Sequence, residues 1–258
     1  MNNRSLSFYK YQGTGNDFII INDEIELEKS EITQLCDRKF GIGADGLILM
    51  SKSKENDFDM NYYNADGSQS FCGNGSRCAV MHANYLEWIS DTCRFSSNDG
   101  IHYAEIEQDT VKLSMRDVDF ILVEEQGYIL NTGSPHYIAY TDDLDNLDLI
   151  TAAHKIRYNE TFKEDGINVN YIESRNGILY IRTYERGVEN ETLSCGTGVT
   201  AAAISHYLEQ DCNQKKYMQK IQTKGGRLTV SFEKKTKRFE NITLNGPAIQ
   251  VFEGTIKI

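Results

Sequence analysis

The chain has 258 residues, of which 40% are hydrophobic, 25% charged and 10% aromatic. This length fits one large or two compact domains with a sizeable core, and this composition excludes a mainly disordered chain. No apolar run approaches the ~18 residues of a membrane helix, and the net charge of −11 has the wrong sign for binding nucleic acid or an anionic membrane. A small molecule is the expected partner.

The cysteines and the N-terminal residues indicate a cytoplasmic protein. The string MNNRSLSFYKYQG has no apolar stretch of the signal-peptide kind. The six cysteines are too scattered for a disulfide scaffold, so free thiols in a reducing compartment are expected. Cys72 and Cys78 have no second Cys or His pair downstream, so no metal site is predicted. No dinucleotide or P-loop motif occurs, so no nucleotide cofactor is expected.

A repeated order of elements begins with a glycine turn that enters a strand. The first half reads GTGNDF at residues 13–18, and the second reads NTGSPHYI at 131–138. Each pattern is typical of a turn that leads into a strand. An amphipathic helix is predicted next in each half, at residues 30–39 with Ser30 as its N-cap, and at residues 148–157.

Asp-Gly pairs and strands continue the same order. Asp45-Gly46 leads into the apolar run LIL, and Asp165-Gly166 leads into INV. A second strand is predicted at residues 59–63 in the first half and at 178–184 in the second.

The clearest match is a Cys-Gly-x-Gly string that opens a helix in each half. CGNG begins at Cys72, before a helix predicted at residues 76–88. CGTG begins at Cys195, before a helix predicted at residues 199–209. Both stretches contain alanine and apolar residues at helical spacing.

A hairpin is predicted after each helix, with turns at residues 98–100 and 224–226. Because five elements recur in one order, we interpret the chain as two pseudo-symmetric, duplicated α+β domains, each with one central helix. The first domain is predicted to span residues 1–117 and to include the C-terminal tail 247–258. The second is predicted to span residues 118–246.

A helix that begins at Cys-Gly-x-Gly combines an anion site with an accessible thiol. The first N–H groups of a helix carry partial positive charge, and glycines let a ligand approach them closely. A cysteine there is expected to have a lowered pKa. If the two domains face each other, one cleft would hold a carboxylate with Cys72 and Cys195 on opposite sides of its α-carbon. One thiolate would then remove the α-proton while the other thiol protonates the opposite face, and backbone N–H groups would stabilise the enolate.

The sequence closely resembles the diaminopimelate epimerase family over essentially its whole length. The strings that carry the resemblance are GTGNDF, NADGSQSFCGNGSRC, GSPH, GINVNYI and YERGVENETLSCGTGVTAAA. The resemblance implies a cofactor-independent isomerase that interconverts LL- and meso-diaminopimelate in lysine and peptidoglycan precursor biosynthesis. It also implies two domains, each a mixed sheet wrapped around a central helix, with the active site in the cleft between them. Family members often dimerise, so the resemblance allows a homodimer.

The resemblance assigns roles to individual residues. Cys72 and Cys195 match the two acid/base cysteines, and His136 and Glu185 match groups that tune these thiols. The backbone N–H groups expected to hold the reacting carboxylate belong to Gly73, Asn74, Gly196 and Thr197. The other residues matched to substrate binding are Asn16, Asn64, Ser134, Asn168, Glu185 and Arg186. A guanidinium suits the distal carboxylate because it forms a bidentate fork.

Two positions depart from the family pattern. Ser134 stands where many members have Asn, and Gly46 stands where some have Gln. Ser donates and accepts hydrogen bonds as Asn does but is shorter, so we keep Ser134 as a substrate contact and leave Gly46 out. The departures concern the substrate contacts more than the reaction.

Other interpretations stay open at this point. Asn16 and Asn64 are also typical loop-forming residues, and Glu185 with Arg186 is also typical of a solvated pair. A racemase of another amino acid would keep both thiols and change the distal pocket. A thiol-redox protein would cycle the two cysteines through a disulfide, and an amino-acid-binding protein would need neither thiol.

Overall fold

The computed structural model describes residues 4–23, 25–124, 127–236 and 238–258. Its backbone contacts divide the chain into two units, Met1–Leu113 with Gly246–Ile258, and Ser114–Asn245. The predicted domain boundaries, 1–117 with 247–258 and 118–246, remain a prediction.

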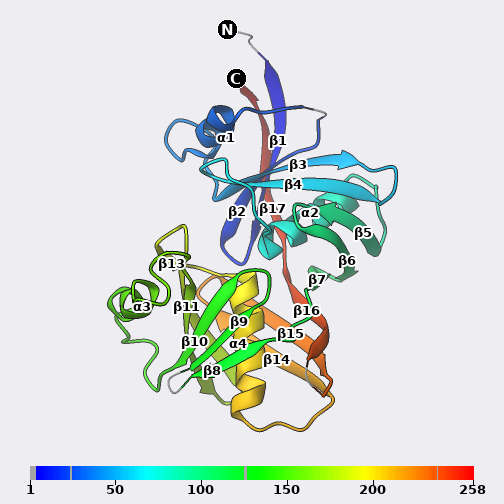
Figure 1. Ribbon diagram of the computed structural model, residues 1–258. Coiled ribbons are helices and arrows are strands. Elements are labelled where there is room, and N and C mark those ends of the chain that lie inside the picture. The colour runs from blue at the N-terminus through cyan, green and yellow to red at the C-terminus, as the bar shows by residue number, and fades with distance from the viewer. Residues whose placement is uncertain (1–3, 24, 125–126, 237) are drawn as a thin grey trace. The chain divides into compact units, whose positions relative to one another are not determined.

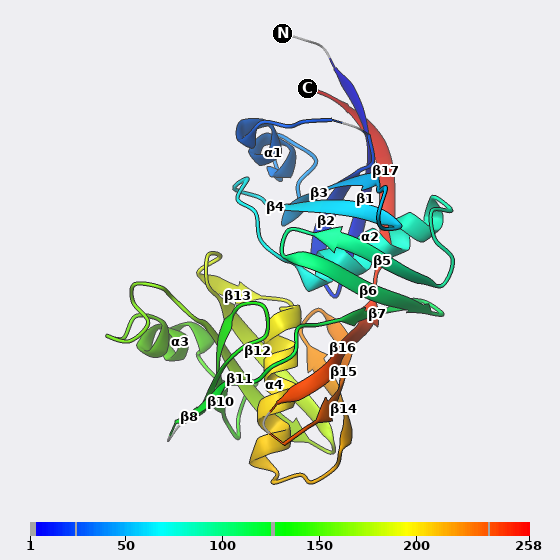
Figure 2. The same cartoon turned by 45° about the vertical axis from the view of Figure 1, so that its right-hand side comes forward.

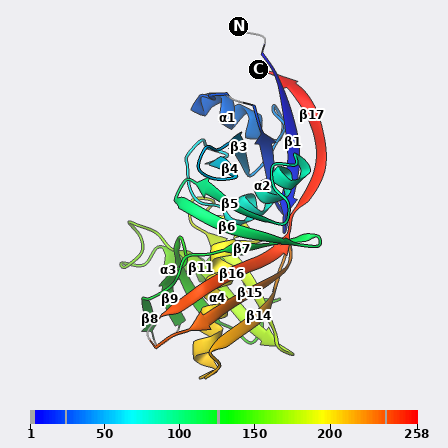
Figure 3. The same ribbon diagram turned by 90° about the vertical axis from the view of Figure 1, so that its right-hand side faces the viewer.

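The first unit is built on a mixed sheet. In spatial order its strands are β17 (Ile249–Lys257), β1 (Ser5–Gly13), β2 (Asn16–Ile21), β3 (Gly46–Lys52), β4 (Phe58–Asn64), β5 (Thr92–Ser97), β6 (Gly100–Glu107) and β7 (Thr110–Ser114). Only the pairs β2–β3 and β4–β5 in this series are parallel. The crossovers of these pairs contain α1 (Lys29–Cys36) and α2 (Gly73–Tyr85), as parallel strands require a long connection. Figure 3 shows β1 and β17 side by side.

The second unit repeats this pairing pattern strand for strand. Its strands are β8 (Ile121–Glu124), β9 (Gly127–Asn131), β10 (Pro135–Tyr140), β11 (Asn168–Arg175), β12 (Ile178–Glu185), β14 (Lys216–Thr223), β15 (Gly226–Lys234) and β16 (Phe239–Pro247). Again two pairs are parallel, β10–β11 and β12–β14, and their crossovers contain α3 (Leu149–Arg157) and α4 (Gly196–Glu209). The short strand β13 (Asn190–Thr192) pairs with the end of β12. The predicted duplication and the predicted α+β class are therefore confirmed.

The helices α2 and α4 are the central helices of their units. Consecutive residues are buried along both, for example Cys78, Ala79 and Val80 in α2, so each helix is covered on every side. Small side chains allow this close packing. The strands β1, β2, β3, β4 and β17 contact α2, and the strands β9, β10, β11, β12, β14 and β15 contact α4 (Figures 1 and 2). In the described part of the chain, every helix falls short of the length and apolarity of a membrane span.

The start of α1 differs from the prediction. The N-cap is Glu28, and the Glu31 carboxylate accepts a hydrogen bond from its backbone N–H at 2.8 Å. Ser30 therefore lies in the first turn, and its prediction as the N-cap is wrong. The physical reason is a capping box formed by two glutamates, which begins the helix before the serine.

Candidate active site

The first candidate thiol, Cys72, lies at the start of α2. It is the N-cap of this helix, with extended backbone angles of φ −136° and ψ 106°. Its Sγ accepts a hydrogen bond from the backbone N–H of Gly75 at 3.4 Å. Gly73 and Asn74 are the first helical residues, and the thiol is half-buried. The sulfur thus lies among N–H groups at the positive end of the helix.

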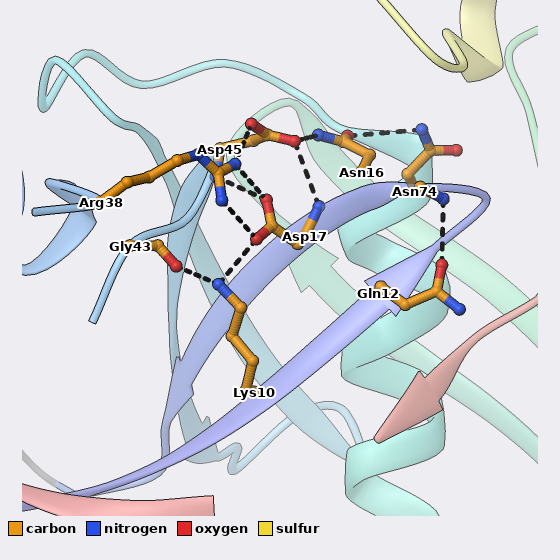
Figure 4. Close-up of polar contacts among 9 residues, drawn as sticks. Lys10, Gln12, Asn16, Asp17, Arg38, Gly43, Asp45 and Asn74 are labelled. Carbon is orange, nitrogen blue, oxygen red and sulfur yellow. Dashed lines mark hydrogen bonds and ion pairs between the residues drawn. The ribbon is translucent and has the colours of Figure 1, made fainter. Parts of the chain in front are cut away.

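Asn16 is held beside Cys72 by the turn that precedes β2. Both residues of the Thr14-Gly15 turn have positive φ values, 53° and 84°, which reverse the chain between β1 and β2. Asn16 Oδ1 lies 3.8 Å from Cys72 Sγ and 3.4 Å from Asn74 Nδ2. Its Nδ2 donates to a carboxylate oxygen of Asp45 at 2.6 Å (Figure 4). Because the carboxylate takes the amide N–H₂ group, the carbonyl oxygen of Asn16 is the atom that faces the sulfur.

A cluster of charged side chains holds Asp45 in place, as Figure 4 shows. Arg38 forms a fork on Asp17 with distances of 2.9 and 2.6 Å, and it contacts Asp45 at 2.7 Å. Lys10, whose side chain is 7% exposed, pairs with Asp17 at 2.8 Å and also donates to the carbonyl oxygen of Gly43. Burial alone would raise the pKa of Asp17, but Arg38 and Lys10 outweigh burial and hold that pKa well below its usual range.

Asn64 ends β4, and its amide is bonded within the protein. Its Nδ2 donates to the Ser68 hydroxyl at 3.0 Å, and its Oδ1 accepts from the Tyr62 hydroxyl at 3.1 Å. The Tyr62 ring lies directly against Gly46. A Cβ atom added at position 46 would be only 2.7 Å from the Tyr62 hydroxyl oxygen. Glycine at this position therefore leaves space for the ring that orients Asn64.

The second candidate thiol, Cys195, is the N-cap of α4. Its backbone angles, φ −124° and ψ 111°, are close to those of the first cysteine, as expected for a duplicated helix start. Gly196 and Thr197 begin the helix, and the Thr197 carbonyl accepts from the Thr132 hydroxyl at 2.7 Å. Cys195 Sγ lies 3.4 Å from Thr197 Oγ1. This cysteine is buried, with 7% of its surface exposed.

Two polar side chains surround the Thr197 hydroxyl. Ser134 Oγ lies 3.1 Å from Thr197 Oγ1, and His136 Nε2 lies 2.9 Å from each of these two oxygens. Burial and, secondly, the charge of Arg186 lower the pKa of His136 to about 3. The imidazole is therefore neutral at pH 7. Thr197 links this imidazole to Cys195.

Asn168 connects the Ser134 turn to the end of β12. Its Nδ2 donates to Ser134 Oγ at 3.1 Å, and its Oδ1 accepts from the backbone N–H of Arg186 at 2.8 Å. The Arg186 guanidinium donates to the carbonyl oxygen of Asp165 at 2.8 Å. Glu185, which is half-buried, is the last residue of β12. The backbone at this strand end is thus tied to the turn before β10.

The structure assembles most of the predicted residues into one cluster in each unit. The first cluster contains Asn16, Cys72 and Asn74. The second contains Ser134, His136, Asn168, Cys195 and Thr197. Each offers a thiol at a helix start with polar partners, which suits proton transfer. The catalytic and binding roles of these residues stay predictions.

Sequence reasoning missed the side chains that hold both clusters. They are Lys10, Asp17, Arg38, Asp45 and Asn170. A signal existed for Asn170, since it follows the predicted Asn168 by two positions on a strand and so shares its face. No group of three or more His, Cys, Asp or Glu side chains suited to a metal ion occurs among the described residues.

A family model and sequence relatives show the family of this chain, and solved structures share its fold. A family model described as diaminopimelate epimerase matches residues 8–121 and 128–251. A diaminopimelate epimerase of Flavobacterium psychrophilum is 45% identical over 258 residues, covering 97% of this chain and 100% of that protein. A PhzF-family phenazine biosynthesis protein of Bacillus anthracis shares the fold, with a TM-score of 0.74, 15% identity and coverage of 99% and 100%. A hydroxyproline epimerase of Agrobacterium vitis has a TM-score of 0.70, 13% identity and coverage of 99% and 93%.

Proposed function

We propose that this chain, which belongs to the diaminopimelate epimerase family, is a cofactor-independent isomerase that interconverts LL- and meso-diaminopimelate. The observation that carries the proposal is the duplicated helix start, in which Cys72 and Cys195 are the N-caps of α2 and α4. A reversible reaction between mirror-related α-carbons needs a similar acid/base group for each face. Duplication supplies two such groups.

In the proposed mechanism both cysteines act on one α-carbon. One thiolate removes the α-proton, and the electron pair of the broken C–H bond moves into the carboxylate, which becomes enolate-like. The S–H group of the other cysteine then protonates the opposite face, so the thiolate and the thiol have exchanged roles. Backbone N–H groups of Gly73, Asn74, Gly196 and Thr197 are proposed to stabilise the growing negative charge.

The other predicted contacts are proposed to bind the rest of the substrate. A second amino-acid end carries both an ammonium and a carboxylate, for which Glu185 and Arg186 are complementary. The bond from the Arg186 backbone to Asn168 supports this proposal, because it holds the strand end in one position. Asn16, Asn64 and Ser134 are proposed as further contacts. A racemase of a smaller amino acid would have no use for this second charged pair.

The test of the reaction and the substrate is proton NMR of the reduced protein with LL-diaminopimelate in D₂O. Deuterium is expected at an α-carbon together with growth of the meso isomer. Exchange with another amino acid but not with diaminopimelate would keep the two-thiol mechanism and change the substrate. Absence of exchange across a panel of amino acids, with the thiols shown to be reduced, would refute the proposal in favour of a redox or binding protein.

Single-cysteine variants test the two-base mechanism. Cys72→Ala and Cys195→Ala are each expected to abolish epimerisation, because either direction needs both a base and an acid. Cys212→Ala is the matched control, since this half-buried free thiol belongs to neither cluster, and it is expected to retain full activity. Normal turnover by either of the first two variants would refute the mechanism.

We also propose a cytoplasmic location and a homodimer. Six free thiols support a reducing compartment, and the net charge of −11 supports a small-molecule substrate rather than nucleic acid. Support for a homodimer comes from apolar side chains on β17, since Ile249, Val251 and Phe252 are 52%, 56% and 47% exposed. Light scattering at assay concentration tests the assembly, and a monomeric mass would refute the dimer.

A further inference from the structure

Asn170 is a buried amide whose contacts determine which of its ends faces the His136 ring. Its Nδ2 lies 3.1 Å from the carbonyl oxygen of Tyr137 and 3.1 Å from His136 Nδ1. Its Oδ1 accepts from the Thr183 hydroxyl at 2.9 Å. The Tyr137 carbonyl oxygen can only accept a hydrogen bond, so the Asn170 atom beside it is the N–H₂ donor. The same N–H₂ group therefore faces the imidazole of His136. Both Asn170 and His136 are 0% exposed, which shields these contacts from bulk water.

This contact fixes the position of the ring proton on His136. An N–H group that points at Nδ1 needs a lone pair there, so Nδ1 is unprotonated. Because the pKa of His136 is lowered to about 3, the ring is neutral and carries its single proton on Nε2. Arg186 is the charged group that acts on this ring, and the other polar side chains bonded around it are neutral. Nε2 therefore donates to a hydroxyl group.

The hydroxyl hydrogens beyond the ring acquire a direction from these donors. Ser134 Oγ accepts from the amide of Asn168 at 3.1 Å, and His136 Nε2 lies 2.9 Å from both Ser134 Oγ and Thr197 Oγ1. Because the protonated Nε2 cannot accept a hydrogen bond, the acceptor for the hydrogen of Ser134 itself is Thr197 Oγ1 at 3.1 Å. The Thr197 hydroxyl then accepts, and its hydrogen is left for Cys195 Sγ at 3.4 Å. A hydroxyl that donates to sulfur favours the thiolate over the thiol.

We propose that Asn170 is a positioning residue for the thiolate of Cys195. By keeping the ring proton of His136 on Nε2, it directs the hydroxyl hydrogens of the chain toward the sulfur. The role of Asn170 in catalysis rests on the proposed function, in which the Cys195 sulfur abstracts or returns an α-proton. Asn170 itself touches no reacting atom and acts through the imidazole.

The first test is the ring tautomer in the unmodified protein. Long-range ¹H–¹⁵N NMR of the ¹⁵N-labelled chain distinguishes protonated from unprotonated ring nitrogens. Nδ1 of His136 is expected to have the shift of an unprotonated nitrogen, and Nε2 that of a protonated one. A protonated Nδ1 would overturn the inference, and this measurement does not depend on whether any variant folds.

The second test measures the thiolate of Cys195 in variants. Asn170→Leu keeps the side-chain size and removes the donor to the ring. The rate at which iodoacetamide alkylates Cys195 at pH 7 is measured by peptide mass spectrometry. This rate is expected to fall about three- to tenfold, because loss of one hydrogen bond of ordinary net strength lowers the thiolate population by about that factor. Thr183→Val is the matched control, because it also removes one buried hydrogen bond of Asn170 but leaves the ring contact intact. It is expected to leave the alkylation rate unchanged.

The outcomes of these tests separate this inference from the proposed function. An unchanged rate in Asn170→Leu, or equal slowing in Thr183→Val, would overturn the positioning role, because a purely structural residue gives that result. Neither test uses substrate. The expected tautomer and rates without α-proton exchange would therefore refute the proposed function and leave the inference standing.

Discussion

Replacing Asp45 by Asn tests whether the charged cluster orients the amide of Asn16. Asp45 accepts the N–H₂ group of Asn16 at 2.6 Å, which leaves Asn16 Oδ1 at 3.8 Å from Cys72 Sγ. An asparagine at position 45 offers either an oxygen or an N–H₂ group. The orientation of the Asn16 amide beside the thiol is then no longer dictated.

The size of the effect follows from the exposure of the partners. A hydrogen bond to a charged group contributes about 1.5–3 kcal/mol when shielded. The Asp45 side chain is 42% exposed, so solvent screening reduces the contribution to about 1 kcal/mol. This corresponds to an expected fall in kcat/KM of about fivefold. Stability is expected to change little, because Arg38, the cationic partner of Asp45, is 57% exposed.

The assay is kcat/KM for α-proton exchange, with urea unfolding of the same preparations. Asp145→Asn is the matched control, since it removes an exposed ion pair to Arg175 at 2.9 Å outside both clusters. The control is expected to keep wild-type kcat/KM. If Asp45→Asn retains full activity, or loses no more than the control, the cluster does not orient Asn16 for catalysis.

Two other substitutions test buried charge and packing. Asp17→Asn is expected to cost about 2–3 kcal/mol at neutral pH, because Lys10 keeps its charge in a buried place without a carboxylate. The pKa of Asp17 is about 3.9 in the unfolded chain and is lowered in the folded protein. The stabilisation that ionised Asp17 gives to the fold is therefore complete above about pH 3.9 and is lost as the pH falls below it. Urea unfolding down to about pH 3 should thus show a smaller acid loss in the variant, and parallel curves would refute this. Gly46→Ala is expected to destabilise by about 1–3 kcal/mol, because the added Cβ would clash with the Tyr62 ring and with the carbonyl oxygen of Tyr63. Tyr62→Leu should recover the part of this loss that is due to the ring in a double-mutant cycle, and additive losses would contradict the clash with the ring.

The duplicated helix starts were predictable because local signals agree there. A cysteine before glycine, followed by small and apolar residues at helical spacing, indicates both the N-cap and the buried face. The structure has Cys72 and Cys195 as N-caps of α2 and α4. The hairpin turns at 98–100 and 224–226 were predicted for a similar reason, since Asn, Asp and Gly mark short turns.

The supporting side chains were not predictable from local patterns. Arg38 and Asp17 are 21 positions apart, and Asn16 and Asp45 are 29 apart, so only the folded sheet reveals their contacts. Each residue alone is typical of a solvated surface. At Ser30 a local signal was misleading. Serine is a good capping residue, but Glu28 and Glu31 form a capping box that begins the helix before it.

The two halves repeat a backbone but not the partners of the two thiols. The atom that faces Cys72 Sγ is Asn16 Oδ1, a carbonyl oxygen that accepts but cannot donate, so this hydrogen bond exists only while Cys72 is protonated. The atom that faces Cys195 Sγ is a hydroxyl oxygen of Thr197, which donates to an ionised sulfur. The start of α2 adds a donor, the backbone N–H of Gly75 at 3.4 Å from Cys72 Sγ, which acts in the opposite sense and favours the thiolate of Cys72. The two thiols of the proposed reaction therefore have different neighbours, an acceptor oxygen at Cys72 and a hydroxyl group at Cys195.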